Sequence, residues 1–200
     1  MPGNNGGANW GGAAVDPAKG ALFVVSKDLP ALLKLAKDPN EDKALAASAG
    51  ERYYTGFGFM IASDGLSPIK PPWSSLTAYD LNTGTIKWKI PLGDVPHLAA
   101  KGHKNTGSHY PKVGPVVTAG GLIFTGTRDR KVRAFDVDDG KVLWEHELDS
   151  ALEGMPAVYE VGGRQYIVFC ASAQVGLTPA TQETIRGAYV AFALKKASTQ

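Results

Sequence analysis

The 200-residue sequence contains a single cysteine, no long apolar run and no block of like charge. With one cysteine no disulfide can form within the chain, and the place of Cys170 in the apolar run YIVFCAS predicts a buried, inert thiol. No stretch approaches the roughly 20 apolar residues of a membrane-spanning helix, and the first residues, MPG, do not begin a secretory signal peptide. The 21 Lys and Arg residues are interspersed with 19 Asp and Glu residues, so no nucleic-acid partner is expected.

Glycine and proline are plentiful, at 24 and 13 residues, and 44% of the residues are hydrophobic. Such a composition is typical of short strands joined by tight turns and favours an all-β protein. One exception is expected over residues 29–37, where apolar residues at helical spacing predict a short helix. The aromatic, irregular stretch 53–73 is predicted to be a loop that packs over the face of the strand assembly.

Two segments, 76–93 and 132–149, repeat one pattern at an offset of 56 residues. The matched pairs are Ala78 with Ala134, Asp80 with Asp136, Gly84 with Gly140, and Trp88 with Trp144. Each copy is typical of a strand, a tight turn that contains Asp and Gly, and a second strand. The equal offsets predict that the two tryptophans occupy equivalent places, each packed between neighbouring units.

Further hairpin patterns complete these units. GPVVTAGGLIFTGT precedes the second copy, GGAAVDPAKGALFVVS precedes the first, and GMPAVYEVGGRQYIVFCAS with GAYVAFAL forms a third unit of three strands. The sequence therefore predicts an all-β partial β-propeller of about two and three-quarter blades of four-stranded antiparallel sheets. The blades cover about 6–93, with an insertion at 27–72, then 113–149 and 154–194.

A propeller needs about four to eight blades to close. Residues 1–196 are therefore expected to be the C-terminal segment of a longer propeller domain, and residues 197–200 a tail. The third unit lacks a fourth strand, which fits a ring whose last blade is closed by a strand from the far N-terminus.

The paired A-[YF]-D-x-x-x-G-x-x-x-W signature resembles the tryptophan-docking repeats of the quinoprotein dehydrogenases. These are eight-bladed propellers that carry pyrroloquinoline quinone (PQQ) on their axis. The segments GGANW, TAGGLIFTGTRDRKVRAFD and YEVGGRQYIVFCASA are similar, in this order, to the last third of the membrane-bound glucose dehydrogenase branch.

The resemblance implies a PQQ-dependent enzyme that oxidises a sugar or polyol and passes electrons to a membrane quinone. It implies a location in the periplasm or at the periplasmic face of the inner membrane. A PQQ-dependent alcohol dehydrogenase is one alternative. A non-enzymatic propeller scaffold similar to outer-membrane assembly lipoproteins is another.

The resemblance also implies four cofactor-binding residues, which are Asn9, Trp10, Asp129 and Gln174. Asn9 of GGANW matches an asparagine that donates to the quinone carbonyl region, where a fixed amide donor stabilises developing negative charge. As an alternative, Asn9 caps a turn and Trp10 only packs. Asp129 matches an aspartate near the cofactor mouth, although a polar turn flanked by arginines is also an ordinary ion-pair site. Gln174 stands where the branch has a histidine, and it cannot titrate near neutral pH.

No metal site is expected in this segment, because the histidines show no metal-ligand spacing and are expected to be solvated: His97, His103, His109 and His146. The resemblance assigns the Ca²⁺ ligands, the catalytic aspartate and the basic residue over the quinone to earlier blades. No catalytic residue is therefore expected in this chain, and the chain alone is expected to be inactive.

Overall fold

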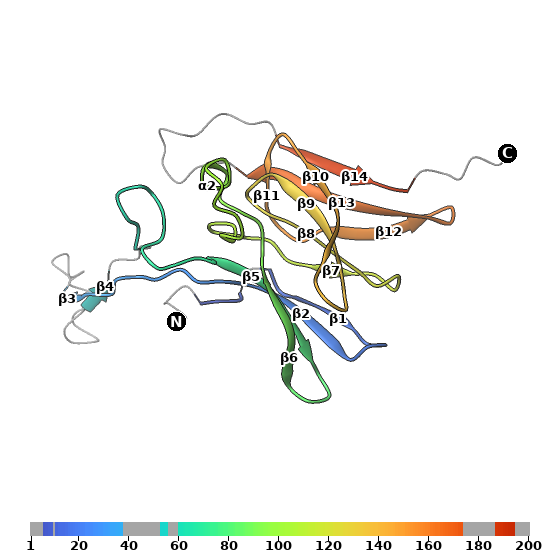
Figure 1. The fold of residues 1–200 in the computed structure, drawn as a ribbon, viewed down its shortest axis with the longest axis horizontal. Coiled ribbons are helices and arrows are strands. Elements are labelled where there is room, and N and C mark those ends of the chain that lie inside the picture. Colours follow the sequence, from blue (N-terminus) through green and yellow to red (C-terminus); the bar gives the residue numbers. More distant parts are fainter. Residues whose placement is uncertain (1–5, 10, 38–52, 56–59, 174–186, 195–200) are drawn as a thin grey trace, which may run out of the picture.

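The computed structural model describes residues 6–9, 11–37, 53–55, 60–173 and 187–194. These residues form three antiparallel sheets that follow one another like the ribs of a fan, with a small two-stranded hairpin extending to one side (Figure 1). The one helix among the described residues, α2 (Pro96–Ala99), is a single turn in the connection between the first two sheets. The all-β prediction is therefore confirmed.

Sheet one has the strand order β1-β2-β5-β6. Its strands are β1 (Ala13–Asp16), β2 (Ala21–Lys27), β5 (Ser74–Asp80) and β6 (Thr85–Pro91). Buried and half-buried residues alternate along the whole of β2, as the two-residue period of a strand requires when one face packs on a core.

Sheet two contains β7 (Val116–Val117), β8 (Leu122–Gly126), β9 (Lys131–Asp136) and β10 (Val142–Glu147), paired in chain order. Residues 127–130 connect β8 to β9, whereas residues 28–73 connect the corresponding strands of sheet one. The two sheets therefore share a strand order and differ most in this one connection.

Sheet three is centred on the long strand β13 (Arg164–Ala173), with β12 (Ala157–Val161) and β14 (Ala188–Phe192) paired to it. The two-residue strand β11 (Ala151–Leu152), which the sequence did not predict, pairs with the end of β13. Cys170 lies on β13 and is half-buried, so the prediction of a buried thiol was wrong in degree.

The repeat recognised in the sequence is also a structural repeat. The Asp80 carboxylate accepts a hydrogen bond from the Asn82 N–H at 2.8 Å, and the Asp136 carboxylate accepts one from the Asp138 N–H at 2.7 Å. In both hairpins the pairing then shifts by one residue just before the tryptophan, so that Trp88 lies opposite Ala78 as Trp144 lies opposite Ala134. Asx turns and bulges thus recur at the same points of the two copies.

Both tryptophans face the following sheet, as predicted. Trp88 is half-buried, and its Nε1–H donates to the Val137 carbonyl of sheet two at 3.1 Å. Trp144 contacts Phe192 of sheet three, with ring centroids 5.1 Å apart, but 38% of its surface is exposed. The two places are therefore equivalent in direction but not in burial.

The core lies between the sheets. Both of the first two sheets contribute large, fully buried side chains to it: Phe23, Leu76, Ile123, Val132 and Phe135. The segments that precede the first strands also meet closely, because a Cβ on Gly11 would overlap the Val113 carbonyl oxygen and a Cβ on Gly114 would overlap the Gly11 carbonyl. Only glycine permits this backbone contact at the inner edge of the fan.

The predicted helix over residues 29–37 is wrong. Leu35–Lys37 forms the strand β3, which pairs with β4 (Tyr53–Thr55) in a hairpin that projects away from the sheets (Figure 1). The leucines that suggested a helical face do not share one, since Leu29 is buried whereas Leu32 is exposed. Pairing with a distant strand decided the conformation here, which a local spacing pattern cannot reveal.

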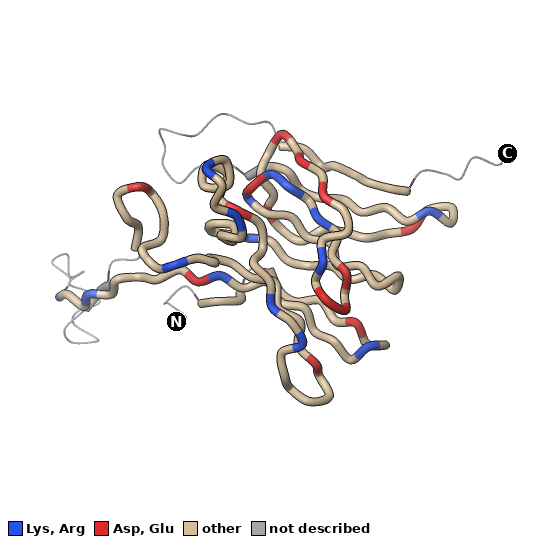
Figure 2. Tube along the Cα trace, viewed as in Figure 1, with Lys and Arg blue, Asp and Glu red and all other residues tan. Residues whose placement is uncertain are grey.

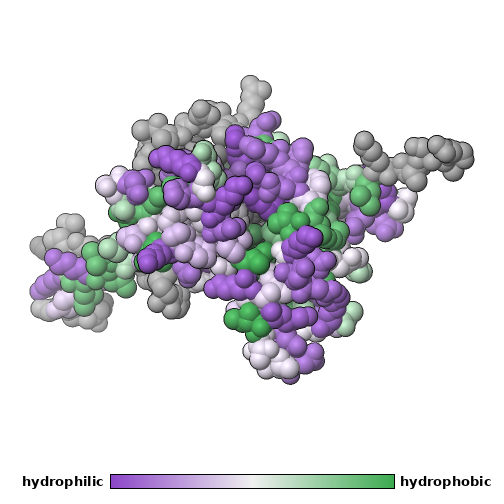
Figure 3. Space-filling view, viewed as in Figure 1, coloured by the Kyte–Doolittle hydropathy of each residue, from purple (hydrophilic) through white to green (hydrophobic). Residues whose placement is uncertain are grey.

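The stretch 53–73 does not pack over the sheets as one loop, contrary to the prediction. Its end does, because Trp73 is buried, but Tyr53 belongs to the projecting hairpin and is exposed. Exposed leucines give the segment that leads into this hairpin an apolar patch (Figure 3): Leu32, Leu33 and Leu35. Over the rest of the described chain, Lys and Arg residues are interspersed with Asp and Glu residues (Figure 2). None of the described helices is long or apolar enough to cross a membrane.

Candidate functional site

Two of the predicted cofactor contacts lie at corresponding ends of neighbouring sheets. Asn9 precedes β1 at the end of sheet one where β2 finishes, and Asp129 lies between β8 and β9 at the matching end of sheet two. The Asp-Gly turns occupy the opposite end. The strand order therefore brings both residues to one rim of the fan.

The Gly6–Asn9 loop is held against the end of β2. The Lys27 N–H donates to the Gly7 carbonyl at 2.8 Å, and Gly6 has a φ of 69°, a conformation that favours glycine. The Asn9 side chain is exposed. This backbone contact holds the loop against sheet one.

Beside this loop lies a shallow cleft that is open to solvent, here called the Asn9 cleft. Its walls come from the loop, the end of β2 and the segment before β7, and include Gly7, Asn9, Gly11, Lys27, Pro111 and Val113. Three parts of the chain thus meet near the starts of β1 and β7. Asn9, Ser26 and Lys27 are the residues with polar side chains among those that line the cleft.

Lys27 is a buried charged residue beside the cleft that sequence reasoning missed. Only 6% of its surface is exposed, and no described residue forms an ion pair or a side-chain hydrogen bond with it. Burial lowers the pKa of its ammonium group below the usual value, and the positive charge of Lys112 lowers it further. The signal was available in the strand ALFVVSK, whose alternation assigns the final lysine to the buried face.

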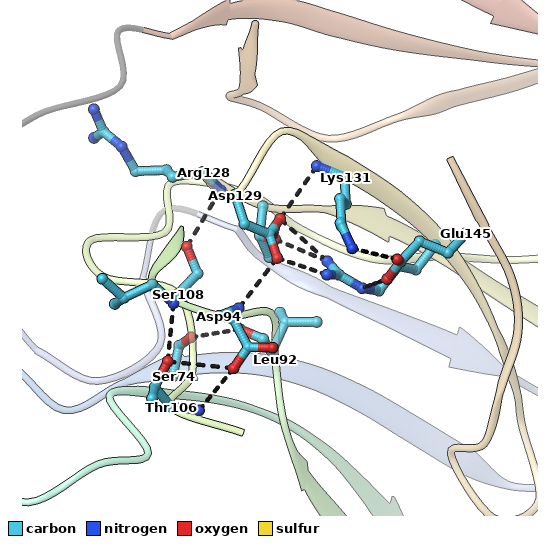
Figure 4. A network of polar contacts seen from close by, with 12 residues as sticks. Ser74, Leu92, Asp94, Thr106, Ser108, Arg128, Asp129, Lys131 and Glu145 are labelled. Atoms are coloured by element: carbon cyan, nitrogen blue, oxygen red, sulfur yellow. Dashed lines mark hydrogen bonds and ion pairs between the residues drawn. The ribbon is translucent and has the colours of Figure 1, made fainter. Parts of the chain in front are cut away.

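Asp129 lies in a buried polar network rather than at an open surface (Figure 4). Its carboxylate accepts hydrogen bonds from Arg133 Nη2 at 2.6 Å, from the Lys131 N–H at 3.1 Å and from the Thr127 hydroxyl. Both Asp129 and Arg133 are nearly fully buried. A bidentate pair of this kind fixes the orientation of both side chains.

The same carboxylate reaches the connection after sheet one. Asp129 Oδ2 accepts from the Asp94 N–H at 3.1 Å, and the Asp94 carboxylate accepts from the Thr106 N–H at 2.9 Å. The Thr106 carbonyl in turn accepts from the Trp73 N–H at 2.8 Å. Figure 4 shows how these groups converge from several loops. Asp129 therefore clamps the loops of two sheets together at the rim.

Arg133 connects the clamp to the outer strand of sheet two. Its Nε donates to Glu145 at 2.8 Å, and Lys131 Nζ donates to the other oxygen of Glu145 at 2.5 Å. Burial raises the pKa of the Glu145 carboxyl, but the hydrogen bonds and charges of Lys131 and Arg133 outweigh this effect and lower it. The Glu145 carboxylate is therefore ionised at neutral pH and is held by two basic side chains.

The prediction that all four histidines are solvated is wrong for His109. Its ring is buried between Trp73 and Tyr110, with ring centroids 5.5 and 4.6 Å away, and neither ring nitrogen has a hydrogen-bond partner. Burial lowers the pKa of His109 to about 4, assisted by the positive charge of Arg128 and opposed by Asp64. The imidazole is therefore neutral at pH 7.

Trp10 and Gln174 lie outside the described residues, so their predicted contacts stay predictions. Within the described ranges, no group of three or more His, Cys, Asp or Glu side chains is arranged to hold a metal ion. The structure thus brings Asn9 to a cleft and Asp129 to a clamp, and it adds Lys27 and His109 as buried titratable groups.

A family model described as the glucose/ethanol/alcohol dehydrogenase β-propeller domain, PQQ, matches residues 1–167. The chain belongs to this family. The predicted membership in the quinoprotein dehydrogenases is confirmed, and so is the predicted propeller architecture, because the three described sheets are consecutive units of such a propeller.

The chain is 34% identical to quinate/shikimate dehydrogenase (quinone) of Acinetobacter baylyi, over 98% of this chain and 26% of the relative. It is 32% identical to quinoprotein glucose dehydrogenase A of Acinetobacter calcoaceticus, over 86% of this chain and 23% of the relative. Its fold resembles the crystal structure of the quinohemoprotein alcohol dehydrogenase from Comamonas testosteroni, with a TM-score of 0.61 and 19% identity over 96% of this chain and 27% of that one. The chain spans about a quarter of the length of these proteins.

Proposed function

We propose that residues 1–200 form part of a PQQ-dependent dehydrogenase that oxidises a hydroxyl group of a sugar or polyol. The observation that carries the proposal is the family match over residues 1–167. We further propose that the electrons pass to a membrane quinone at the periplasmic face of the inner membrane, because similar relatives are named as quinone-linked dehydrogenases.

The arrangement at the rim suits this cofactor. When bound, PQQ supplies the oxidising group that accepts a hydride from the substrate carbon. In this proposal the Asn9 amide, which lies beside the Asn9 cleft, would donate a hydrogen bond to a carbonyl oxygen of the bound cofactor on which negative charge develops. Trp10 and Gln174 are proposed as further cofactor contacts on the resemblance alone.

Asp129 serves this site by positioning the surrounding loops. The protein itself supplies donors to both of its carboxylate oxygens, from Arg133, Asp94 and Lys131. A contact between Asp129 and PQQ would therefore be added to the hydrogen bonds that its carboxylate already accepts from these donors. Its main contribution in this proposal is a rigid rim, which preserves the geometry that binding and hydride transfer need.

Two other functions, a PQQ-dependent alcohol dehydrogenase and a non-enzymatic scaffold, make different predictions from this one. A PQQ-dependent alcohol dehydrogenase would share the cofactor and prefer simple alcohols. A non-enzymatic scaffold would bind no PQQ. The family match favours an enzyme over a scaffold, and the similarity to dehydrogenases for quinate and for glucose favours polyhydroxylated substrates over simple alcohols.

The test uses the complete dehydrogenase that contains this segment, reconstituted with PQQ and Ca²⁺. Reduction of an artificial electron acceptor is followed with glucose, glycerol, quinate and ethanol. We expect PQQ-dependent reduction with a polyhydroxylated substrate and none from the 200-residue chain alone. Failure to bind PQQ would support the scaffold, and a preference for ethanol would support the alcohol dehydrogenase.

An Asn9→Ala variant tests the proposed role of the amide. We expect kcat to fall about 10²- to 10³-fold, the usual cost of removing one donor to a developing charge. Asn82→Ala is the matched control, because Asn82 lies in the exposed Asp-Gly turn at the opposite end of sheet one. Unchanged turnover and PQQ affinity for Asn9→Ala would leave Asn9 with only a turn-capping role.

A further inference from the structure

The alternation along β2 continues to its last residue with a change of chemistry. Ala21, Phe23 and Val25 occupy the buried face, and Lys27 is the next residue on that face. A charged side chain at a core-facing position is costly unless a partner of opposite charge accompanies it. The end of β2 therefore carries a feature that the packing of sheet one does not require.

The part of the chain that the structure describes supplies no such partner. No carboxylate there forms an ion pair with Lys27, including that of the adjacent Asp28, and the charge that most affects the ammonium group is the positive charge of Lys112. The pKa of Lys27 is lowered accordingly. Lys27 is therefore a nearly buried cation, and an anion beside it would offset the cost of burying its charge.

The place of Lys27 indicates where that anion would come from. Lys27 lines the Asn9 cleft, which is open to solvent and which Asn9 also lines. The backbone contact with Gly7 couples its position to that of the Asn9 loop. A ligand carboxylate bound in this cleft would lie beside Lys27.

We propose that Lys27 is a carboxylate-binding residue of the Asn9 cleft, where its ammonium group pairs with a carboxylate of the cofactor or of an acidic substrate. This inference rests on the proposed PQQ-dependent function. Both sources are chemically suitable, because PQQ carries carboxylate groups and quinate is a hydroxylated carboxylic acid, whereas glucose and glycerol are neutral. A charge-assisted pair in such a partly desolvated place is stronger than one at an open surface.

The experiment compares Lys27→Met, Lys27→Arg and Lys34→Met in the complete dehydrogenase. Lys34→Met is the control, because Lys34 is exposed on the connection that follows β2. Three quantities are measured: the Kd for PQQ in the apo enzyme, kcat/KM for quinate and for glucose in the PQQ-loaded enzyme, and the Tm of the apo enzyme.

A cofactor carboxylate as the partner predicts that Lys27→Met weakens PQQ binding about 10- to 100-fold, as expected for loss of a charge-assisted hydrogen bond. A substrate carboxylate predicts unchanged PQQ binding and an equally large fall in kcat/KM for quinate, with the value for glucose unchanged. In either case Lys27→Arg retains part of the affinity, Lys34→Met changes neither quantity more than twofold, and Lys27→Met raises the Tm of the apo enzyme because an unpaired buried charge is removed.

The rise in apo stability distinguishes a binding role from a structural one, because a lysine that stabilises the fold would lower the Tm when replaced. PQQ binding and quinate turnover that both stay within twofold of wild type would overturn the proposal while leaving the proposed function intact. Equal losses for quinate and glucose with unchanged PQQ affinity would also overturn it. A wild-type enzyme that binds no PQQ would overturn the proposed function, and this inference with it.

Discussion

Sheets one and two repeat each other closely at one end and differ at the other. At the Asp-Gly end, the same carboxylate-capped turn and the same shift of pairing occur in both sheets, and Lys19 pairs with Asp138 across them at 2.6 Å. At the opposite rim, sheet one has an exposed asparagine loop and a buried lysine, whereas sheet two has the Asp129 clamp. The Asp-Gly end therefore repeats closely from one sheet to the next, whereas the rim carries different side chains in each sheet.

The largest expected loss of stability comes from breaking the Asp129 clamp, and it is compared with the loss from breaking an exposed ion pair. Asp129→Ala leaves the Arg133 guanidinium buried without its main partner, so the free energy of unfolding should fall by about 3 to 5 kcal/mol. Glu147→Ala removes an exposed partner of Arg130 and should cost less than about 1 kcal/mol. Urea denaturation of the 200-residue chain measures both, and equal losses would show that the rim is no more firmly held than the surface.

The second prediction concerns pH and the rim loop that holds His109. Because the folded-state pKa of His109 is about 4 and the ordinary value is 6.5, the unfolded chain binds the proton first as the pH falls. The associated stability is fully present above pH 6.5 and is lost progressively as the pH falls through 4, by up to about 3 kcal/mol.

His109→Phe should abolish this part of the pH dependence of unfolding, since a phenyl ring fills the site between Trp73 and Tyr110 without titrating. His97→Gln is the control for loss of an imidazole, because His97 is exposed. A His109→Phe profile that is identical to wild type between pH 4 and 7 would rule out the buried neutral imidazole.

The third prediction tests the uniform end. Gly140 has a φ of 74°, and an added Cβ would lie 2.9 Å from the Trp88 ring, whereas a Cβ on Gly84, with a φ of 70°, would meet nothing within 4 Å. Gly84→Ala should cost only the backbone strain, about 1 kcal/mol. Gly140→Ala should cost about 2 to 3 kcal/mol, because overpacking against Trp88 is added. Equal midpoint shifts in urea would mean that Trp88 does not dock on this turn.

The smallest effect distinguishes the two repeated tryptophans. Trp88→Phe removes the hydrogen bond to the Val137 carbonyl and should cost about 1 kcal/mol beyond the loss of ring surface. Trp144→Phe replaces a side chain that is 38% exposed and should cost only a few tenths of a kcal/mol. Thermal unfolding of the two variants, followed by circular dichroism, would contradict the comparison if Trp144→Phe were the more destabilising change.

Much of the fold follows from the sequence alone. The hairpins, the Asp-Gly turns and the direction of the two tryptophans depend on residues that are close in the chain, so a repeated local pattern is enough to predict them. The alternation of β2 even assigns Lys27 to the buried face. Asn9 could be singled out only by resemblance, because nothing in GGANW itself indicates a cleft.

The tertiary structure decided what depends on residues far apart in the sequence. Residues 35–37 form a strand, not a helix, because residues 53–55 pair with them. Asp129 lies in a clamp, not an exposed turn, because Arg133 and the loop at Asp94 close around it. His109 is neutral because Trp73 and Tyr110 bury it. Burial and pairing of charges arise from packing between segments, and a local pattern carries no information about which segments meet.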